Sequence, residues 1–429
     1  MKDTSGEELP ANSLGHPNLP RSRPLLRQPA FRFLWAGSVA SSIGSSAGFL
    51  AIVWLVFGET RSAFDVALLG LAGLVPRVLF GIVAGALADR FNRIRLMMAA
   101  DGLRAATMIG LASSLILVGF SFPVILLAVI VVALGQTIFR PAINSFLPTI
   151  VRAEELGRAN GLVTSAQEIT AIVGSPLGGF LIASVGVATT LALNGASYAV
   201  SGLLLFAMAF ALITGGGAAP GPLANRPAFR TQVREGFAYL KGQAALLKLT
   251  LASFGANFFL ALFYSFLVVY VSEVLGGSAL TLGILAGASG LGFAVGSLSV
   301  GRLRSERRFG FWFSAGWGIA GVTLLGVILL PDLIAAAIFL FIAGVGGGFG
   351  NTTFFTGVQK FVPNELLGRY LSIDEVGSLA AGPAGTLVGG LLIVMAGIRI
   401  DYTLASAGTA IFSFGLLLFP DVRALRTES

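Results

Sequence analysis

The chain has 429 residues, of which 55% are hydrophobic and only 11% are charged. Soluble globular proteins carry about 25% charged residues, so this composition excludes an ordinary water-soluble domain. The net charge of +8 does not indicate nucleic-acid binding, because the basic residues lie between apolar blocks and not in one polar domain.

The apolar residues form long uncharged blocks, for example 121–134 and 176–225. About 20 consecutive apolar residues cross a bilayer as an α-helix, which satisfies its own backbone hydrogen bonds in lipid. A transmembrane barrel would instead show short alternating segments, which these blocks do not. We therefore predict an all-α membrane protein embedded in the lipid bilayer.

In chain order, the sequence begins with a polar, Pro-rich segment, 1–29, which contains the only histidine, His16. It has no apolar core and is therefore no signal peptide, so we expect a disordered cytoplasmic tail. Six predicted spans within 30–213 form a first bundle, and six within 245–420 form a second bundle. A basic Gly/Pro-rich linker, 214–244, connects the bundles, and 421–429 form a cytoplasmic tail. The twelve predicted spans are 31–57, 64–87, 94–119, 122–149, 158–184, 187–213, 245–273, 278–300, 309–330, 332–360, 366–396 and 400–419.

The basic residues predict the orientation of these spans. With the N-terminus in the cytoplasm, most of the 28 Lys and Arg residues fall on the cytoplasmic side, and only Arg61 and Arg399 fall outside. Arg77, Arg104 and Arg140 lie within spans. The positive-inside rule then predicts a multi-pass protein of the cell inner (plasma) membrane with both termini in the cytoplasm.

An internal repeat relates the two halves of the chain. A shift of 211 residues superposes several sites at once: Glu154, Gly157 and Arg158 on Glu365, Gly368 and Arg369; Gly178-Gly179 on Gly389-Gly390; Gly81 on Gly292; and Gly85 on Gly296. The shift is close to half the chain, so we predict two related six-helix bundles. Two such halves place a binding site between them near the bilayer midplane, and rocking of one half against the other gives alternating access.

Several motifs resemble the major facilitator superfamily over about residues 25–420. Segment 85–95, GALADRFNRIR, is similar to its loop 2–3 signature, motif A, and 174–179, GSPLGG, is similar to its antiporter motif C, with Ser175 where Gly is usual. Segment 381–385, AGPAG, is a partial counterpart in span 11. The segments FRFLW at 31–35, FRPA at 139–142, LP at 147–148 and EELGRAN at 154–160 resemble the branch of the enterobactin exporter and macrolide efflux proteins. The resemblance implies a twelve-helix exporter driven by the proton gradient.

The motif A residues suggest a conformational latch formed by Gly85, Asp89, Arg90, Arg93 and Arg95. Asp89 ends span 2 on the cytoplasmic face, where the start of span 11 should lie opposite. A helix N-terminus carries partial positive charge, so Asp89 would hold the halves together there. The arginines would add ion pairs and lipid-headgroup contacts. The alternative is that all four charged residues only anchor the topology.

The helix 5 motif consists of Gly174, Pro176, Gly178 and Gly179. Small residues allow helices to approach closely. Proline also removes a helical hydrogen bond, which predicts a kink at Pro176. A gating bend and simple close packing both remain open as the role of this motif.

One carboxylate within the spans is the candidate for proton coupling. Glu168 lies about ten residues into span 5 and is interpreted as the only acid so deep, so an ionisable group there is a functional candidate. Arg140 in span 4 is its nearest counter-charge. It resembles the arginine that the major facilitator superfamily carries in span 4, in its motif B. We hypothesise that protonation of Glu168 breaks a salt bridge to Arg140 during transport; a static pair is the alternative.

Asp101 and Arg104 in span 3 predict a local ion pair near the inner interface. The role of Arg77 stays open.

One departure from the related exporters bears on coupling. Their span 1 often carries an Asp after a Gly, whereas here Gly44 is followed by Ser45. If that acid is the usual proton carrier, Glu168 must replace it or the coupling must differ.

The resemblance implies that spans 1, 4, 7 and 10 line the substrate cavity. The candidates are Ser41, Ser45, Phe49, Gln136, Arg140, Asn257, Phe258, Phe263, Tyr264, Asn351, Phe354 and Phe355. Aromatic rings with a few amides suit a large, amphipathic small molecule such as a drug, macrolide or siderophore. With 34 Phe in the chain, ordinary core or lipid-facing packing is the alternative for each one.

Two other functions compete with an exporter: an importer or facilitator of a metabolite, and a membrane-embedded receptor or enzyme. The last would need clustered His, Cys or acidic groups, but the chain has one His and no Cys. We therefore predict a monomeric transporter, not an enzyme, with no cofactor, no metal and no nucleic acid, whose partners are a small-molecule substrate and protons.

Overall fold

The computed structural model describes residues 24–214, 240–302 and 309–423. The predicted linker and the two tails lie largely outside these ranges, as do the side chains of Asp89, Glu168 and some other helical positions. In the described ranges every regular element is a helix and no strand forms. The prediction of an all-α protein is confirmed.

The first half of the chain forms five helical elements. They are α1 (Pro29–Thr60), α2 (Ala63–Arg90), α3 (Arg93–Leu117), α4 (Phe122–Ile150) and α5 (Leu156–Thr214), with short 3-10 turns η1 (Leu25–Arg27) and η2 (Ala153–Glu155). The 59-residue α5 is two helices joined at Gly186, whose φ of 81° and ψ of 170° reverse the chain direction. Glycine tolerates this positive φ because it has no Cβ.

The second half begins with α7 (Ala244–Tyr264), which is interrupted before the short α8 (Leu267–Val269) and the π-turn η3 (Tyr270–Val274). It continues with α9 (Ala279–Ser299), η4 (Val300–Arg302), α10 (Phe309–Leu329), α11 (Leu333–Phe361), α12 (Asn364–Ala396), α13 (Ile398–Gly415), η6 (Leu416–Leu418) and α14 (Pro420–Arg423). The sequence predicts one continuous span over 245–273, whereas the structure breaks it at Ser265 and Phe266.

Ten helices of the described residues are long and apolar enough to cross a membrane, and Ala380–Ala396 of α12 is a shorter apolar stretch. One of the ten, Ile172–Leu212, contains the turn at Gly186. Counting its two arms separately and adding α12 gives the twelve spans predicted from the sequence. That number rests on this division.

The turns between helices carry their own capping groups. Ser62 caps α2 by accepting a hydrogen bond from Asp65 N–H, and Asn92 caps α3 by accepting from the N–H groups of Ile94 and Arg95. Asp332 does the same for α11. Such side chains satisfy the N–H groups that a helix start leaves unpaired, which is why these polar residues end the apolar blocks.

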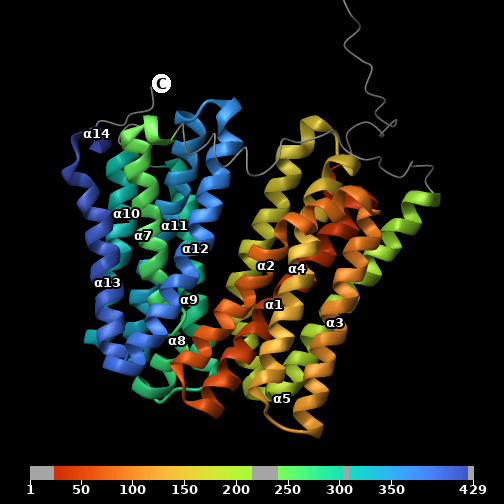
Figure 1. Cartoon of the computed structure of the whole chain (residues 1–429), viewed down its shortest axis with the longest axis horizontal. Helices are drawn as coiled ribbons and strands as arrows, with labels where there is room; N and C mark the ends of the chain where they lie inside the picture. Colours follow the sequence, from red (N-terminus) through yellow and green to blue (C-terminus); the bar gives the residue numbers. More distant parts are fainter. Residues whose placement is uncertain (1–23, 215–239, 303–308, 424–429) are drawn as a thin grey trace, which may run out of the picture.

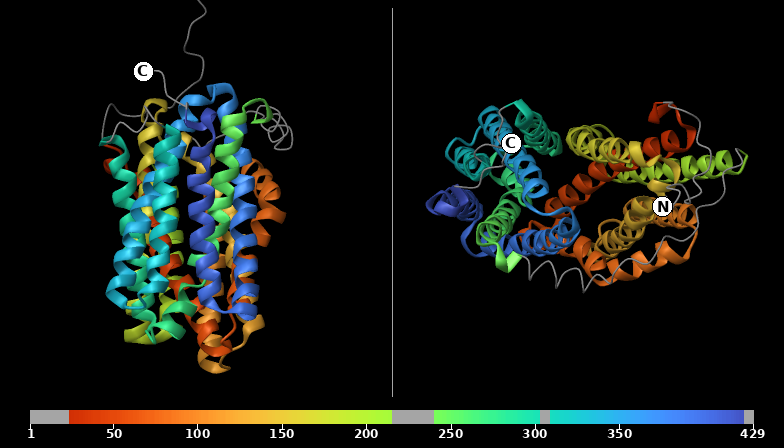
Figure 2. Two further views of the ribbon diagram at one scale, coloured as in Figure 1. Left: turned by 90° about the vertical axis from the view of Figure 1, so that its left-hand side faces the viewer. Right: turned by 90° about the horizontal axis from the view of Figure 1, so that it is seen from above.

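The helices are arranged as two bundles side by side, α1–α5 in one and α7–α14 in the other (Figures 1 and 2). The turns at 61–62, 118–121, 186, 275–278, 330–332 and 397 lie at one end of the molecule, which we call the sealed end. The described chain termini and the turns at 91–92, 151–155 and 362–363 lie at the other, the open end. Figure 1 shows the bundles meeting towards the sealed end and diverging towards the open end.

Two pairs of helices form the seam between the bundles near the sealed end. In the first, α5 packs on α9: a Cβ built on Gly179 would lie 3.1 Å from the Cα of Gly283, and the Pro176 ring lies against Gly287. In the second, α2 packs on α12: a Cβ on Gly390 would lie 2.8 Å from the Cβ of Ala67. Glycine thus permits a backbone approach that any side chain would obstruct.

The predicted kink at Pro176 is not a break in the helix. Inside α5 only Gly186 has non-helical backbone angles, so the helix continues through the proline. The Pro176 ring also has a role in packing, because it fills the space left by Gly287 of α9. A kink without a break stays a prediction.

Candidate functional site

A polar cavity of about 450 Å³ lies within the first bundle. Most of its lining is contributed by α1, α4 and α5, and it is rich in hydroxyl, amide and guanidinium groups. The polar lining residues are Ser38, Ser41, Ser42, Ser45, Ser46, Arg77, Arg104, Gln136, Arg140, Thr170, Asn194 and Tyr198. Five serines fall on α1 within three turns, so one helix face supplies nearly half of these groups.

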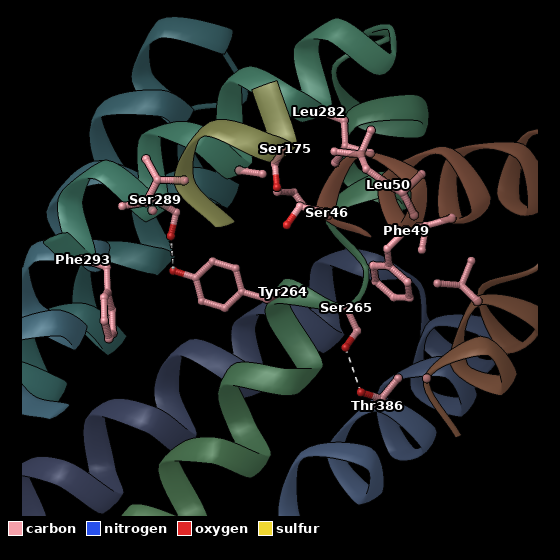
Figure 3. Close-up of a pocket in the computed structure, with 18 residues that line it drawn as sticks. Ser46, Phe49, Leu50, Ser175, Tyr264, Ser265, Leu282, Ser289, Phe293 and Thr386 are labelled. Atoms are coloured by element: carbon pink, nitrogen blue, oxygen red, sulfur yellow. Dashed lines mark hydrogen bonds between the residues drawn. The ribbon is translucent and has the colours of Figure 1, made fainter. Parts of the chain in front are cut away.

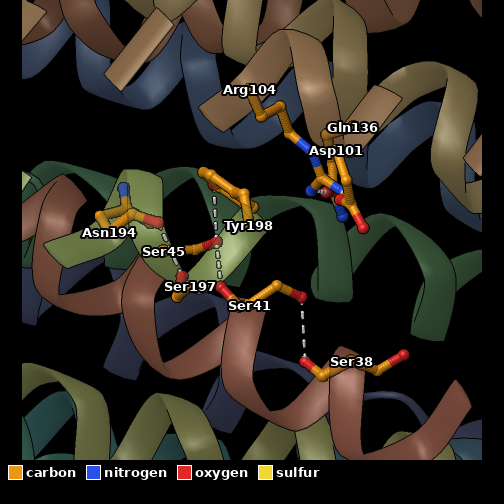
Figure 4. A network of polar contacts seen from close by, with 9 residues as sticks. All are labelled: Ser38, Ser41, Ser45, Asp101, Arg104, Gln136, Asn194, Ser197 and Tyr198. Atoms are coloured by element: carbon orange, nitrogen blue, oxygen red, sulfur yellow. Dashed lines mark hydrogen bonds and ion pairs between the residues drawn. The ribbon is translucent and has the colours of Figure 1, made fainter. Parts of the chain in front are cut away.

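A buried ion pair closes one wall of this cavity (Figure 4). Arg104 of α3 donates to the carboxylate of Asp101 one turn earlier and, at 2.6 Å, to the side-chain carbonyl of Gln136 on α4. Its guanidinium carbon also lies 4.7 Å from the ring centre of Phe139 and 4.5 Å from that of Tyr198. The Arg104 side chain therefore ties α3 to α4 and α5.

This pair was predicted from the sequence, but its place was not. We expected it near the inner interface, whereas both residues are buried, Asp101 at 0% and Arg104 at 2% exposure. Asp101 lies eight residues into α3, about 12 Å along its axis. Asp101 is therefore a second acid well inside a predicted span of the first bundle, besides Glu168.

A second hydrogen-bonded group lies on the α1 side of the cavity (Figure 4). The Ser45 hydroxyl donates to the carbonyl of Ser41 at 2.6 Å and lies 2.8 Å from the hydroxyl of Tyr198. Because the single proton of Ser45 is already used, Tyr198 is the donor to Ser45. Ser45, at the position where the family resemblance leads us to expect an acid, is thus paired with a tyrosine.

Two further arginines border the polar cavity. Arg140 of α4 and Arg77 of α2 are both exposed to it. Among the described side chains, none forms a hydrogen bond or ion pair with Arg140. The side chain of its predicted partner, Glu168, is not described, so the proposed exchange between the two stays a prediction.

An apolar cavity of about 520 Å³ lies between the bundles, next to the polar one. Its lining comes from α1, α2, α5, α7, α8, α9 and α12, and includes Phe49, Leu50, Val53, Val66, Ile172, Tyr264, Leu267, Val268, Leu282 and Phe293. Few polar groups line it: Ser289 donates to the Tyr264 hydroxyl at 3.0 Å, and the Ser265 and Thr386 hydroxyls lie 2.8 Å apart (Figure 3). The first bond joins α7 to α9, and the second joins the break between α7 and α8 to α12.

The two cavities share Ser46 and Phe49 of α1. Phe49 is 53% exposed, although it belongs to a helix that is otherwise well packed. One face of α1 therefore borders a polar space and an apolar space at the same level. Two adjoining cavities of this kind suit a ligand with a polar and an apolar part.

The structure brings some of the predicted cavity residues together and leaves others apart. Ser41, Ser45, Phe49, Gln136, Arg140 and Tyr264 line the cavities. Asn257, Phe258, Phe263, Asn351, Phe354 and Phe355 line neither in this conformation. Phe354 is 2% exposed and packs on Phe313, and the Asn257 amide donates to Ser253 C=O at 3.0 Å, so both are occupied within the second bundle.

The sequence analysis missed Ser38, Ser42, Ser46, Thr170, Asn194 and Tyr198 of the polar lining. A signal for the serines exists: hydroxyls at 38, 41, 42, 45 and 46 recur with helical spacing along span 1. Ser265, Ser289 and Thr386 have no such pattern, since they come from three separate segments of the chain: the break after α7, α9 and α12.

The motif residues have different surroundings. Gly174 and Gly178 face Ser46 and Ala47 of α1, so the helix 5 motif packs α5 against α1 as well as against α9.

In motif A, Arg93 is buried whereas Arg90 and Arg95 are exposed. No described atom lies within 4 Å of a Cβ built on Gly85. A latch at Asp89 stays a prediction.

A comparison with known proteins identifies the family. The profile of the family described as "Transmembrane secretion effector" matches residues 22–428. The chain belongs to this family of the major facilitator superfamily. It is a membrane transporter and not an enzyme.

Curated relatives of this major facilitator transporter span most of its length. The uncharacterised MFS-type transporter YfiS of Bacillus subtilis is 26% identical, over 92% of this chain and 94% of the relative. Macrolide efflux protein A of Streptococcus pyogenes is 24% identical, covering 90% and 94%. The multidrug efflux pump Tap of Mycobacterium tuberculosis is 27% identical, covering 88% and 90%.

Solved structures confirm the major facilitator fold. A bacterial homologue of the iron transporter ferroportin in an inward-facing state gives a TM-score of 0.72 at 16% identity, covering 92% of this transporter and 99% of that chain. At this identity the likeness concerns the fold alone.

Proposed function

We propose that this transporter is a proton-driven exporter of amphipathic small molecules, such as drugs, macrolides or siderophores, and that it works by alternating access. The observation that carries the proposal is the pair of adjoining cavities. The polar one offers hydroxyl, amide and guanidinium groups, and the apolar one offers aliphatic and aromatic side chains. Pockets that combine apolar walls with a few placed polar groups bind drug-sized ligands.

The seam supports alternating access. Both close contacts between the bundles, α5 on α9 and α2 on α12, lie near the sealed end. Arg61 at the α1–α2 turn also donates to the Ser272 hydroxyl across this end at 3.0 Å. Rocking of one bundle on the other would separate these contacts and close the open end. The latch proposed for Asp89, with Arg90 and Arg95, would hold the opposite state.

We assign the open end to the cytoplasm of a bacterial plasma membrane. The exposed Arg90, Arg95 and Arg158 lie at this end, and only Arg61 and Arg399 among the described basic residues lie at the sealed end. This distribution follows the positive-inside rule. Attachment of an impermeant thiol reagent to cysteine introduced at Arg158 or at Val118 in intact cells tests the assignment: only Val118→Cys should react.

For coupling, we propose that Glu168 gains and loses the transported proton and that Arg140 stabilises its ionised form. Arg140 borders the polar cavity and has no partner among the described side chains, so it is available for this role. An opposite charge nearby favours an ionised carboxylate, and its loss favours the protonated acid.

The test is transport into everted membrane vesicles under an imposed pH gradient. Glu168→Gln should abolish gradient-driven accumulation of a fluorescent amphipathic probe while counterflow of the same probe continues. Glu154→Gln, which neutralises an exposed carboxylate in η2, is the matched control and should behave as wild type. Unchanged gradient-driven transport in Glu168→Gln removes Glu168 from the mechanism.

The direction of transport separates an exporter from an importer of the same fold. An exporter concentrates its substrate inside everted vesicles, whereas an importer concentrates it inside right-side-out vesicles. The names of the macrolide and multidrug efflux relatives favour export. A receptor without transport activity would show binding but no accumulation in either preparation.

A further inference from the structure

Asp401 is a buried acid that the cavities do not explain. It lies in the first turn of α13, near the sealed end, and its side chain is 0% exposed. Both carboxylate oxygens lack a hydrogen-bond partner among the described residues. Asp401 lines neither cavity. Water in the cavities therefore does not reach it in this conformation.

Its surroundings are apolar and aromatic. A Cβ built on Gly389 of α12 would lie 3.1 Å from the Asp401 carboxylate and 2.6 Å from the ring of Phe266. The neighbouring Tyr402 stacks on Phe263 with ring centres 3.9 Å apart. The side of α13 that carries these residues is thus filled by rings and by a glycine of α12.

The elements packed against α13 bring no cation to this place. α10 has no ionisable side chain, the half of α12 near the sealed end has none, and the basic residue of α7, Lys248, lies near the open end. The titratable groups that remain are Tyr264, Tyr270 and Tyr402, and Arg399 on the same helix is exposed. Tyr270 already donates its proton to Val327 C=O at 2.7 Å.

The burial of Asp401 and its lack of a partner determine whether its carboxyl group is protonated. A buried ionised carboxylate without a partner is so costly that the group takes up a proton instead. The N-terminus of α13 favours negative charge, but this effect is modest beside the loss of hydration. The conformation with a closed seam therefore holds Asp401 as the neutral acid.

The buried acid is connected to the seam through two neighbours. Phe266 lies against both Gly389 and Gly390, and Gly390 in turn faces Ala67 and the Ala63 carbonyl of α2 in the other bundle. Withdrawal of α2 from α12 would uncover Gly390 and one side of Phe266. That is the route by which water at the sealed end would reach Asp401. The charged groups across this seam do not neutralise Asp401. Asp65 of α2 is half-buried and is itself a carboxylate. Arg61 donates its hydrogen bond to Ser272.

We propose that Asp401 is a proton-binding site that controls the seam at the sealed end: it holds a proton while α2 packs on α12, and it releases that proton to water when the seam opens. Ionisation stabilises the open seam and protonation stabilises the closed seam. The proton returns to the same side from which it came, because Asp401 does not border the cavities. The site therefore makes the gate sensitive to pH on that side, and it acts independently of Glu168.

The test is a distance measurement across the sealed end of the full-length transporter in lipid nanodiscs. The chain has no cysteine, so spin labels on Val118→Cys and Leu330→Cys, which are 80% and 55% exposed, are the only labels. As pH rises from mildly acidic to mildly alkaline, the population with separated labels should grow. For one proton per transition, the ratio of open to closed molecules rises up to about tenfold per pH unit.

Two neutral variants and one control make the result specific. Asp401→Asn and Asp401→Leu should both remain closed at all pH values. Wild type at neutral pH should show an infrared band of a protonated Asp401 carboxyl, and this band should be missing from both variants. Asp332→Asn neutralises an exposed acid at the same end and keeps its cap on α11, because an amide oxygen also accepts from Ile334 and Ala335 N–H. It should titrate as wild type does.

A wild-type distance distribution that does not change with pH would overturn the proposal without any variant. A pH response that survives in either Asp401 variant would overturn it as well. Because the measurement needs neither substrate nor a proton gradient, a failure here is distinct from a failure of the proposed proton-driven export.

Discussion

Gly179 of α5 and Gly390 of α12 stand at equivalent positions of the two bundles, and each presses against a helix of the opposite bundle. Gly179 faces Ala279 and Gly283 of α9, and Gly390 faces Ala63 and Ala67 of α2. Their predecessors, Gly178 and Gly389, face Ala47 and Phe266 of their own bundles. The repeat of 211 residues in the sequence is thus a repeat of two contacts that together close one end of the molecule.

A side chain at Gly179 should prevent this closure. In Gly179→Val the new atoms would overlap the α9 backbone, since a Cβ alone would lie 2.5 Å from the Ala279 carbonyl oxygen. Overpacking of this kind costs about 1–3 kcal/mol, which corresponds to a shift of roughly 5- to 150-fold towards the state with an open seam. The distance between spin labels on Val118→Cys and Leu330→Cys, which lie in different bundles at the sealed end, measures the shift.

The matched control for that substitution is Gly110→Val in α3. No described atom lies within 4 Å of a Cβ at this glycine, so the added side chain has room. Gly110→Val should leave the seam unchanged. Equal effects of the two variants would show that the helix-propensity change, and not the seam contact, is responsible.

Breaking the ion pair between Asp101 and Arg104 should destabilise the first bundle. In Asp101→Ala the buried guanidinium keeps only Gln136 and two aromatic faces. Loss of one partner of a buried pair costs about 3–5 kcal/mol. Thermal unfolding in detergent, followed by circular dichroism, measures the loss.

The double variant Asp101→Leu with Arg104→Met separates charge from packing. Because it removes both charges of this pair and leaves neither one unpaired, it should recover most of the stability lost in Asp101→Ala. If the double variant is less stable than the single one, the pair contributes through its hydrogen bonds and not through mutual neutralisation.

Much of the fold follows from the sequence because the physics is local. Apolar blocks of span length, ended by Ser62, Asn92 or Asp332, determine where helices begin. The Asp101–Arg104 pair was predictable from the three-residue spacing on one helix. The glycine pairs at 178–179 and 389–390 were visible as a repeat, although their partners were not.

The site was less predictable because it depends on contacts between helices. Phe49 and Phe354 are the same residue type within apolar spans, yet one is half exposed in a cavity and the other is buried against Phe313. The burial of Arg104 depends on Phe139 and Tyr198, which come from two other helices. No pattern in a single span contains that information.

The two phenylalanines should respond to truncation in opposite ways. Phe49→Ala removes a ring that lines both cavities, so it should raise the KM for a transported probe while the protein stays stable. Phe354→Ala removes a core ring and should cost about 3–5 kcal/mol of stability with little change in KM. Transport kinetics and thermal unfolding of both variants make the comparison; a raised KM in Phe354→Ala alone would place the binding site elsewhere.

The open end carries an ion pair whose loss should be visible in acid. Lys248 Nζ of α7 lies 2.6 Å from Asp421 Oδ2 of α14, and it also lies 4.5 Å from the centre of the Phe419 ring. The hydrogen bond from Lys248 lowers the pKa of the Asp421 carboxyl below its usual value. A lowered pKa means that the pair stabilises the docked α14 above the ordinary carboxyl range, near pH 3.9, and that this stabilisation is lost as pH falls through the lowered pKa.

Hydrogen exchange of the backbone amides of residues 421–423 measures the docking of α14. In wild type these amides should be protected at neutral pH and should lose protection in acid beyond the intrinsic change of exchange rate. Asp421→Asn should show reduced protection at neutral pH and no further acid response, and high salt should weaken the wild-type protection in the same way because the pair is accessible to solvent. Lys248→Met keeps much of the aliphatic stem over Phe419 and removes the charge, so it separates packing from the ion pair. If hydrogen exchange in Lys248→Met matches wild type, the packing on Phe419 and not the ion pair holds α14 in place.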